Sequence, residues 1–96
     1  MNNKFQKGNT VRFSSVFYDF ADQVVDPDTV AMNILSAKFQ SISTHTPQRD
    51  DAGKYHADVT LAQAGEFYAE WTGMIQTLPS VRRDWFMVEE YSKEAP

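Results

Sequence analysis

Apolar and polar side chains alternate along much of this chain, and the alternation predicts most of its elements. Over residues 9–18, every second position carries Val11, Phe13, Ser15 and Phe17, and the alternate positions carry Arg12, Ser14, Val16 and Tyr18. This is the period of a strand with one buried face. Comparable patterns predict further strands over residues 30–35, 38–44 (an edge strand), the two halves of 53–73 on either side of "AQAG", and 81–90.

Turn signals separate these strands. The segment "DFADQVVDPDT" is rich in Asp and contains Pro27, which predicts a turn with one short irregular edge segment at Val24 and Val25. The segment "HTPQRDDAG" at 45–53 predicts a polar loop, and "GMIQTLPS" at 73–80 predicts a connection between strands.

A helix is the alternative for residues 29–42. Val30, Ile34 and Lys38 share helical spacing, and Thr29 is a suitable N-cap. The β-branched residues of this segment and the neighbouring strands favour a sheet.

Six or seven short strands in about a hundred residues predict an all-β fold, an immunoglobulin-like antiparallel β-sandwich of about seven strands. A small closed barrel is the alternative architecture. We expect residues 1–8 to form a flexible N-terminal arm, residues 9–90 the sandwich domain, and residues 91–96 a flexible C-terminal tail.

The composition of the chain argues against several classes of function. The net charge of −4 argues against nucleic acid as a partner, because phosphate binding requires clustered Lys and Arg. No apolar run approaches the length of a membrane span, and the first residues lack the apolar centre of a secretory signal. The absence of cysteine excludes disulfides and thiol chemistry and fits folding in a reducing cytoplasm.

No motif in the chain predicts catalysis or a cofactor. His45 and His56 lack partners at metal-ligand spacing, and no G-x-S-x-G elbow frames any serine, so we expect a protein that is not an enzyme. Four aspartates within ten residues leave calcium as an alternative to a solvated turn, although their spacing does not match an EF-hand loop: Asp19, Asp22, Asp26 and Asp28.

Alternation also divides the aromatic residues between the interior and the surface. The interior set that it predicts is Phe13, Phe17, Tyr55, Phe67, Trp71 and Phe86. Large side chains left on outer faces suggest contact with another chain or a sugar. We expect that one of Arg82 and Arg83 pairs with Asp84, Glu66 or Glu70 across the sheet, or that the two contact an acidic partner. The candidate partner surface is therefore Tyr18, His56, Tyr68, Glu70, Arg82, Arg83, Trp85 and Met87.

Three stretches together resemble a known group of proteins: "GNTVRFSSVFYDFADQVVDPDTVAMNI", "GKYHADVTLAQAGEFYAEWTG" and "WFMVEE". They are similar to the small immunoglobulin-like domain proteins of tailed bacteriophages, over roughly residues 8 to 90. The chain departs from the family pattern at 19–23, where such proteins often have a Gly-containing turn, and in the connection "MIQTLPSVRR".

The resemblance implies a virion structural protein made in the host cytoplasm. We expect its partners to be capsid or other virion proteins, with neither nucleic acid nor membrane among them, and self-association within the particle is compatible with this role. A capsid decoration or cementing protein on the head shell is the first hypothesis. The alternatives are a neck, tail or baseplate component, and a carbohydrate-binding adsorption module with Trp85 and Tyr68 as a flat pair of rings.

Overall fold

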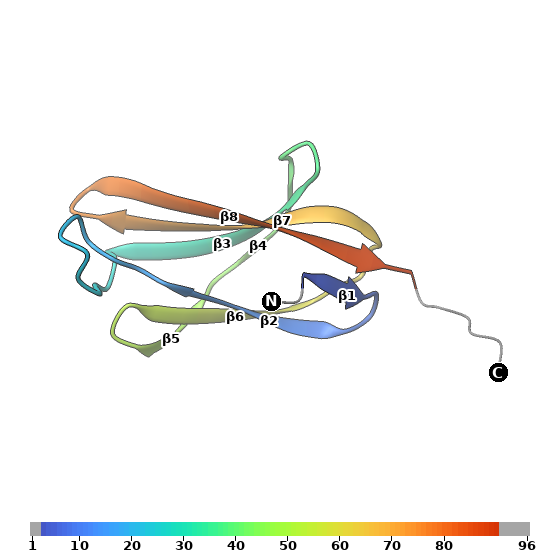
Figure 1. The fold of residues 1–96 in the computed structure, drawn as a ribbon, viewed down its shortest axis with the longest axis horizontal. Helices are drawn as coiled ribbons and strands as arrows, with labels where there is room; N and C mark the ends of the chain where they lie inside the picture. The colour runs from blue at the N-terminus through green and yellow to red at the C-terminus, as the bar shows by residue number, and fades with distance from the viewer. Residues whose placement is uncertain (1–2, 91–96) are drawn as a thin grey trace.

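The computed structural model of the protein describes residues 3–90 and arranges them as two packed β-sheets (Figure 1). A five-stranded sheet has the order β1-β8-β7-β3-β4, and a three-stranded sheet has the order β2-β6-β5. The predicted all-β sandwich is thereby confirmed. The strands are β1 (Lys4–Gln6), β2 (Thr10–Val16), β3 (Thr29–Ser36), β4 (Ser41–His45), β5 (Gln48–Asp51), β6 (Lys54–Thr60), β7 (Gly65–Ile75) and β8 (Leu78–Glu89).

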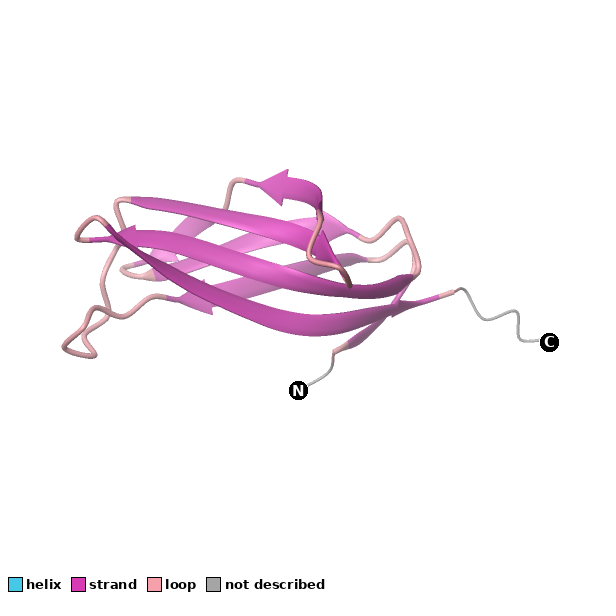
Figure 2. Cartoon of the chain, turned by 90° about the horizontal axis from the view of Figure 1, so that it is seen from above, coloured by secondary structure: helices cyan, strands magenta, loops and turns pink. Residues whose placement is uncertain are grey.

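The described part of the chain consists of strands, turns and loops (Figure 2). Within residues 3–90 there is no helix long and apolar enough to cross a membrane. Strands β3 and β4 occupy the segment for which a helix was the alternative, so the strand interpretation was the right one. The edge strand predicted at 38–44 begins only at Ser41, because a turn precedes it.

The predicted interior rings meet between the two sheets. Trp71 is 1% exposed, and its ring lies 6.4 Å from that of Phe17 in an edge-on arrangement. Phe67 stacks on Phe86 with 5.7 Å between the ring centroids. Phe13 is half-buried and packs against this cluster. These rings share the core between the sheets with aliphatic side chains such as Ile34, Leu61 and Val88.

Part of the predicted N-terminal arm belongs to the sheet. Strand β1 pairs in parallel with β8, with Phe5 opposite Val88. The Phe5 ring also makes edge contacts with Phe13 and Phe86. Three residues are too short to show a period, and their pairing partner lies at the other end of the chain, so local pattern could not predict this strand. Residues 1–2 and the predicted tail at 91–96 lie outside the described residues.

The predicted polar loop at 45–53 contains strand β5, which pairs with β6. All four residues of β5 are exposed, so the strand has no buried face and therefore no apolar period.

The predicted connection at 73–80 is instead the end of a long hairpin. Strands β7 and β8 are joined by Gln76 and Thr77, whose φ angles of 52° and 66° are both positive. Two central residues of this kind form the turn that suits a two-residue hairpin. Neither residue is the Gly or Asn that usually marks this turn, and so the sequence did not predict it.

Candidate partner-binding surface

The outer face of the five-stranded sheet carries most of the predicted partner-binding residues. In β7 and β8, the residues that alternate with the buried rings point away from the core. The register places Tyr68 opposite Trp85, and Leu35 of β3 opposite Tyr68, so three large side chains form a row across the sheet. We call this row and its neighbours the outer patch: Leu35, Phe39, Glu66, Tyr68, Glu70, Arg83 and Trp85.

Phe39 folds over the row from the turn between β3 and β4. Its φ of 64° is held by local hydrogen bonds, because its N–H donates to the Ser36 carbonyl oxygen at 2.8 Å. The Phe39 ring stacks on Tyr68 with 4.9 Å between centroids. Leu35 is buried although it lies outside the central core. The turn therefore creates a small second apolar cluster on the outside of the sheet.

Charged side chains hold the rings of the outer patch in place. Arg83 donates from Nε to Oε2 of Glu70 at 2.8 Å, and its guanidinium carbon lies 5.2 Å from the centre of the Phe39 ring. The indole N–H of Trp85 donates to Oε1 of Glu66 at 3.2 Å. Because these rings are ordered before any partner arrives, binding to them costs less side-chain entropy.

The structure brings together five of the eight predicted surface residues. Tyr68, Glu70, Arg83 and Trp85 belong to the outer patch, and Met87 lies beside it, opposite Glu66. One arginine was expected to pair across the sheet, and Arg83 does so with Glu70 of β7. Arg82 pairs instead with Asp84 of its own strand. Phe39, Leu35 and Glu66 were missed as members of the patch. A signal for Leu35 existed, since β3 has apolar residues on both faces.

The other predicted surface residues lie elsewhere. His56 was expected on an exposed face, and this is wrong: it is 8% exposed, and its Nδ1 lies 2.7 Å from Oδ1 of Asp50 in β5. Alternation does place His56 on the outside of β6, but the unpredicted strand β5 supplies the side chain that covers it. Tyr18 is exposed in the loop after β2, where it forms an isolated bridge with Val24.

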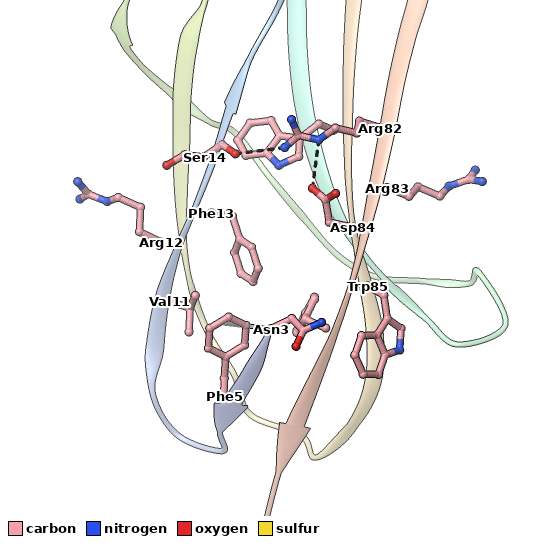
Figure 3. Close-up of a pocket in the computed structure, with 12 residues that line it drawn as sticks. Asn3, Phe5, Val11, Arg12, Phe13, Ser14, Arg82, Arg83, Asp84 and Trp85 are labelled. Atoms are coloured by element: carbon pink, nitrogen blue, oxygen red, sulfur yellow. Dashed lines mark hydrogen bonds and ion pairs between the residues drawn. The ribbon is translucent and has the colours of Figure 1, made fainter. Parts of the chain in front are cut away.

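Arg82 faces a pocket of about 800 Å³ between β2 and β8 (Figure 3). Its Nη2 donates to the Ser14 carbonyl oxygen at 3.3 Å, and its Nε donates to Oδ2 of Asp84 at 3.1 Å. The guanidinium therefore reaches from one sheet to the other across the mouth of the pocket. The apolar lining comes from Phe5, Val11, Phe13, Trp71 and Phe86.

Asp26 joins the Asp-rich loop to the three-stranded sheet. Its Oδ1 accepts hydrogen bonds from Nε of Arg49 at 3.0 Å, from the Gly53 N–H at 2.8 Å and from the Tyr55 hydroxyl at 2.9 Å. The Arg49 bonds, followed by the Gly53 N–H, lower the pKa of Asp26 well below its ordinary value of 3.8. Burial raises the pKa of Tyr55, so its hydroxyl keeps the proton that it donates.

Hydrogen bonds within the chain account for the positions of two aspartate side chains in this loop. Asp19, by contrast, uses its Oδ1 within the loop, accepting from the N–H groups of Ala21 and Gln23. Residues 3–90 hold no group of three or more His, Asp or Glu placed to bind a metal ion. Hydrogen bonds within the chain therefore occupy the Oδ1 atoms of both Asp19 and Asp26.

Asp26→Asn is expected to destabilise the protein at neutral pH and to have a smaller effect in acid. The folded-state pKa of Asp26 lies below its unfolded value, so its stabilising contribution is complete above about pH 4 and is lost as the pH falls towards the folded pKa. Urea unfolding midpoints at pH 7, 5, 4 and 3 measure the effect. Asp28→Asn, a matched change two residues along, is the control. A deficit of equal size at pH 7 and pH 3 would contradict this role.

A second pocket, of about 390 Å³, lies beside β4 and the end of β6. On its wall, the Ser43 hydroxyl oxygen is 2.9 Å from Nε2 of His45. Nucleophilic catalysis by such a pair needs a third group that orients the imidazole. The lining of this pocket, within the described residues, includes no carboxylate.

Comparison with known proteins relates this chain to others by fold alone. No protein-family model matches it, and no curated protein matches its sequence. A candidate glycoside hydrolase from Bacteroides vulgatus is similar in structure, with a TM-score of 0.65 and 17% identity over 98% of this chain and 17% of that chain. CopC from Methylosinus trichosporium has a TM-score of 0.62 and 11% identity, over 96% of this chain and 87% of that chain.

A DUF4785 family protein from Legionella pneumophila is also similar, with a TM-score of 0.65 and 12% identity, over 93% of this chain and 26% of that chain. This chain therefore spans only a small part of the hydrolase and of the DUF4785 protein. At such low identity, the three likenesses show that the sandwich fold is shared.

Proposed function

We propose that this chain is a non-enzymatic structural protein of a tailed bacteriophage particle, attached to the head shell through the outer patch. The observation that carries the attachment site is the arrangement of the patch itself. It sets Trp85, Tyr68 and Arg83, residue types that dominate binding energy at protein interfaces, side by side on an open sheet face. The resemblance of residues 8 to 90 to phage proteins supports the virion as the setting.

A particle shell can bind a small patch of this kind firmly, because it offers many docking sites. Leu35 is buried and Tyr68 and Trp85 are half-buried, so a single contact through the patch is expected to be weak. A shell presents many symmetric copies of the same docking site, and attachment at several points raises the total affinity without new contacts. The exposed charged members of the patch, Glu66 and Arg83, can be recognised by a partner surface of matching charge.

The carbohydrate alternative is less well supported by the same geometry. A sugar-binding platform requires open ring faces, and the predicted platform was Tyr68 with Trp85. One face of Tyr68 is stacked against Phe39, and the Trp85 indole N–H is already bonded to Glu66. Phe39 remains 53% exposed, but it is a single ring on a turn.

The proposal is tested on particles of the encoding phage. Quantitative mass spectrometry of separated heads and tails should find the protein on heads, at a copy number set by capsid symmetry. Absence from particles would overturn the virion assignment. Presence on tails alone would favour the neck, tail or baseplate alternative.

The outer patch is tested by binding of the purified protein to heads that lack it. Phe39→Asn should weaken binding by about tenfold or more, because an aromatic anchor of an interface is typically worth at least 1.4 kcal/mol. Tyr18→Asn is a matched control, since Tyr18 and Phe39 are both aromatic and both 53% exposed. Melting curves should show both variants folded. Equal binding by both variants would place the contact outside the patch.

A further inference from the structure

One side of β8 is open along most of its length. Strand β7 pairs with β8 on one side, from Leu78 to Val88, whereas β1 pairs on the other side only from Met87 to Glu89. Among the described residues, no other strand pairs with β8. A row of unpaired backbone groups at a sheet edge is a template for another strand.

The hydrogen bonds at the β1 end show which residues face this edge. The N–H of Met87 donates to the Asn3 carbonyl oxygen, and the carbonyl oxygen of Glu89 accepts from the Lys7 N–H, both at 2.9 Å. In a strand, alternate residues direct their backbone groups to the same side. Val81, Arg83 and Trp85 therefore direct their N–H and C=O groups to the open edge.

The open edge has two defined ends. Pro79 stands on the same side and has no N–H to donate, which limits pairing at one end. Strand β1 occupies the edge from Met87 onward at the other end. The stretch that can pair is therefore Ser80 to Phe86, and its central residue is Arg83.

We propose that this edge pairs antiparallel with the same edge of a second copy of the chain, forming a two-fold dimer whose five-stranded sheets join into one. A two-fold axis that passes beside Arg83 uses the whole open stretch. It pairs the backbone N–H and C=O groups of Val81 with those of Trp85 in the second copy. This assignment rests on the edge alone and is independent of the virion proposal.

Charge selects this register. With the axis at Arg83, Arg82 lies directly opposite Asp84 of the second copy, at positions that bring side chains closest together. An axis at Arg82 would place Arg82 opposite Arg82 and Asp84 opposite Ser80, with no pair of opposite charges across the interface, and it would bring in Pro79. An axis at Asp84 would oppose two carboxylates and reach Met87, which already pairs with β1.

The side chains on the outer face of β8 can also be accommodated in this register. Val81 is 52% exposed on the outer face of β8, and the dimer places it against Trp85 of the second copy. The two Arg83 side chains meet at the axis, but each guanidinium is bonded to Glu70 of its own copy at 2.8 Å. Their mutual repulsion is thereby reduced. Inward-pointing charges such as Arg82 and Asp84 also hinder pairing with unrelated strands.

Sedimentation of the whole chain from about 10 µM to about 1 mM tests the dimer, because so short an interface predicts weak association. The mass should rise with concentration from 11.0 kDa towards twice that value. Arg82→Asp alone and Asp84→Arg alone should each raise the dissociation constant at least tenfold. An equimolar mixture of these two variants should recover association, because each then supplies the charge that the other lacks.

Lys38→Asp, a charge reversal in the turn before β4, is the control and should leave association unchanged, and circular dichroism should show every variant folded. A wild-type chain that stays monomeric at about 1 mM overturns the proposal, and any partner of this edge is then another protein. Dimerisation of both single variants at the wild-type strength, or a mixture that fails to associate, also overturns it.

Cross-linking tests the register separately from affinity, and the chain has no cysteine of its own. Arg83→Cys should form an intermolecular disulfide on oxidation, because paired residues at the axis lie about 5.5 Å apart between Cα atoms. Val81→Cys should not cross-link to itself, but it should cross-link to Trp85→Cys in a mixture. Cross-linking of Val81→Cys to itself as readily as Arg83→Cys would exclude this register.

Discussion

Trp71→Ala is expected to lower the free energy of unfolding by about 3–5 kcal/mol, the range for removal of a large buried aromatic side chain. Trp71 is 1% exposed, lies opposite Met32 of β3 and packs edge-on against Phe17. The cavity left behind would lie at the centre of the core, where neighbouring side chains collapse only partly. Guanidinium unfolding followed by circular dichroism measures the loss. A domain of this size has only about 5–10 kcal/mol of stability, so the variant should be close to unfolding.

Trp85→Ala is the matched control, since it removes the other tryptophan of the chain. Trp85 is half-buried on the outer face and makes one hydrogen bond, to Glu66. The expected loss is about 1 kcal/mol, the usual scale for partly exposed sites. Equal losses in the two variants would contradict the assignment of one tryptophan to the core and the other to the outer patch.

Gly53→Ala is expected to destabilise the protein by about 2–4 kcal/mol, through backbone strain and crowding together. The φ of Gly53 is +71°, a conformation that glycine adopts most easily. A Cβ at this position would overlap Cγ1 of Val24 and lie 3.0 Å from the Val25 carbonyl oxygen. The Phe17 N–H donates to the Gly53 carbonyl oxygen at 2.9 Å, so a backbone shift that relieved the crowding would strain this bond.

Gly8→Ala separates the two causes. Gly8 has a φ of +96°, but a Cβ there would meet nothing within 4 Å. Strain alone should cost about 1 kcal/mol, as measured by the same unfolding experiment. If Gly53→Ala cost no more than Gly8→Ala, the close approach of the Val24 side chain and the Val25 carbonyl to residue 53 would not contribute to the loss of stability.

Gly53 and Asp26 also give a physical reason for two of the stretches that resemble phage proteins. Asp26 lies in the first of the three stretches, and Gly53 and Tyr55 lie at the start of the second. The structure joins these two stretches, because the Asp26 carboxylate accepts from the Gly53 N–H and from the Tyr55 hydroxyl. The presence of Asp26, Gly53 and Tyr55 in these stretches is therefore explained by their role in folding. They do not by themselves identify a partner.

Strands with one strongly apolar face could be predicted from the sequence. Val11 and Phe13 mark β2, and Phe67 and Trp71 mark β7. Large apolar side chains at every second position are buried together on one face only if the segment is a strand. Strands without an apolar face could not be predicted in this way. The exposed residues of β5 and the three residues of β1 are held by pairing with partners, and pairing leaves no local pattern.

The outer patch was predicted only in part, for a similar reason. Alternation identified Tyr68 and Trp85 as outward-facing residues. It placed Phe39 in a strand, whereas the Ser36 hydrogen bonds form a turn that lays the Phe39 ring across Tyr68. Which rings are open and which are covered depends on the path of that turn.

By itself, the sequence determined the two-sheet class of the fold, the aromatic content of its core and the outward set on β7 and β8, because these follow from side-chain periodicity over neighbouring residues. Only the tertiary structure decided the burial of His56 by Asp50, the cover over Tyr68 and the open edge of β8 with Arg83 at its centre. Each of these depends on segments that are distant or out of phase in the chain, and their proximity is set by strand order and register.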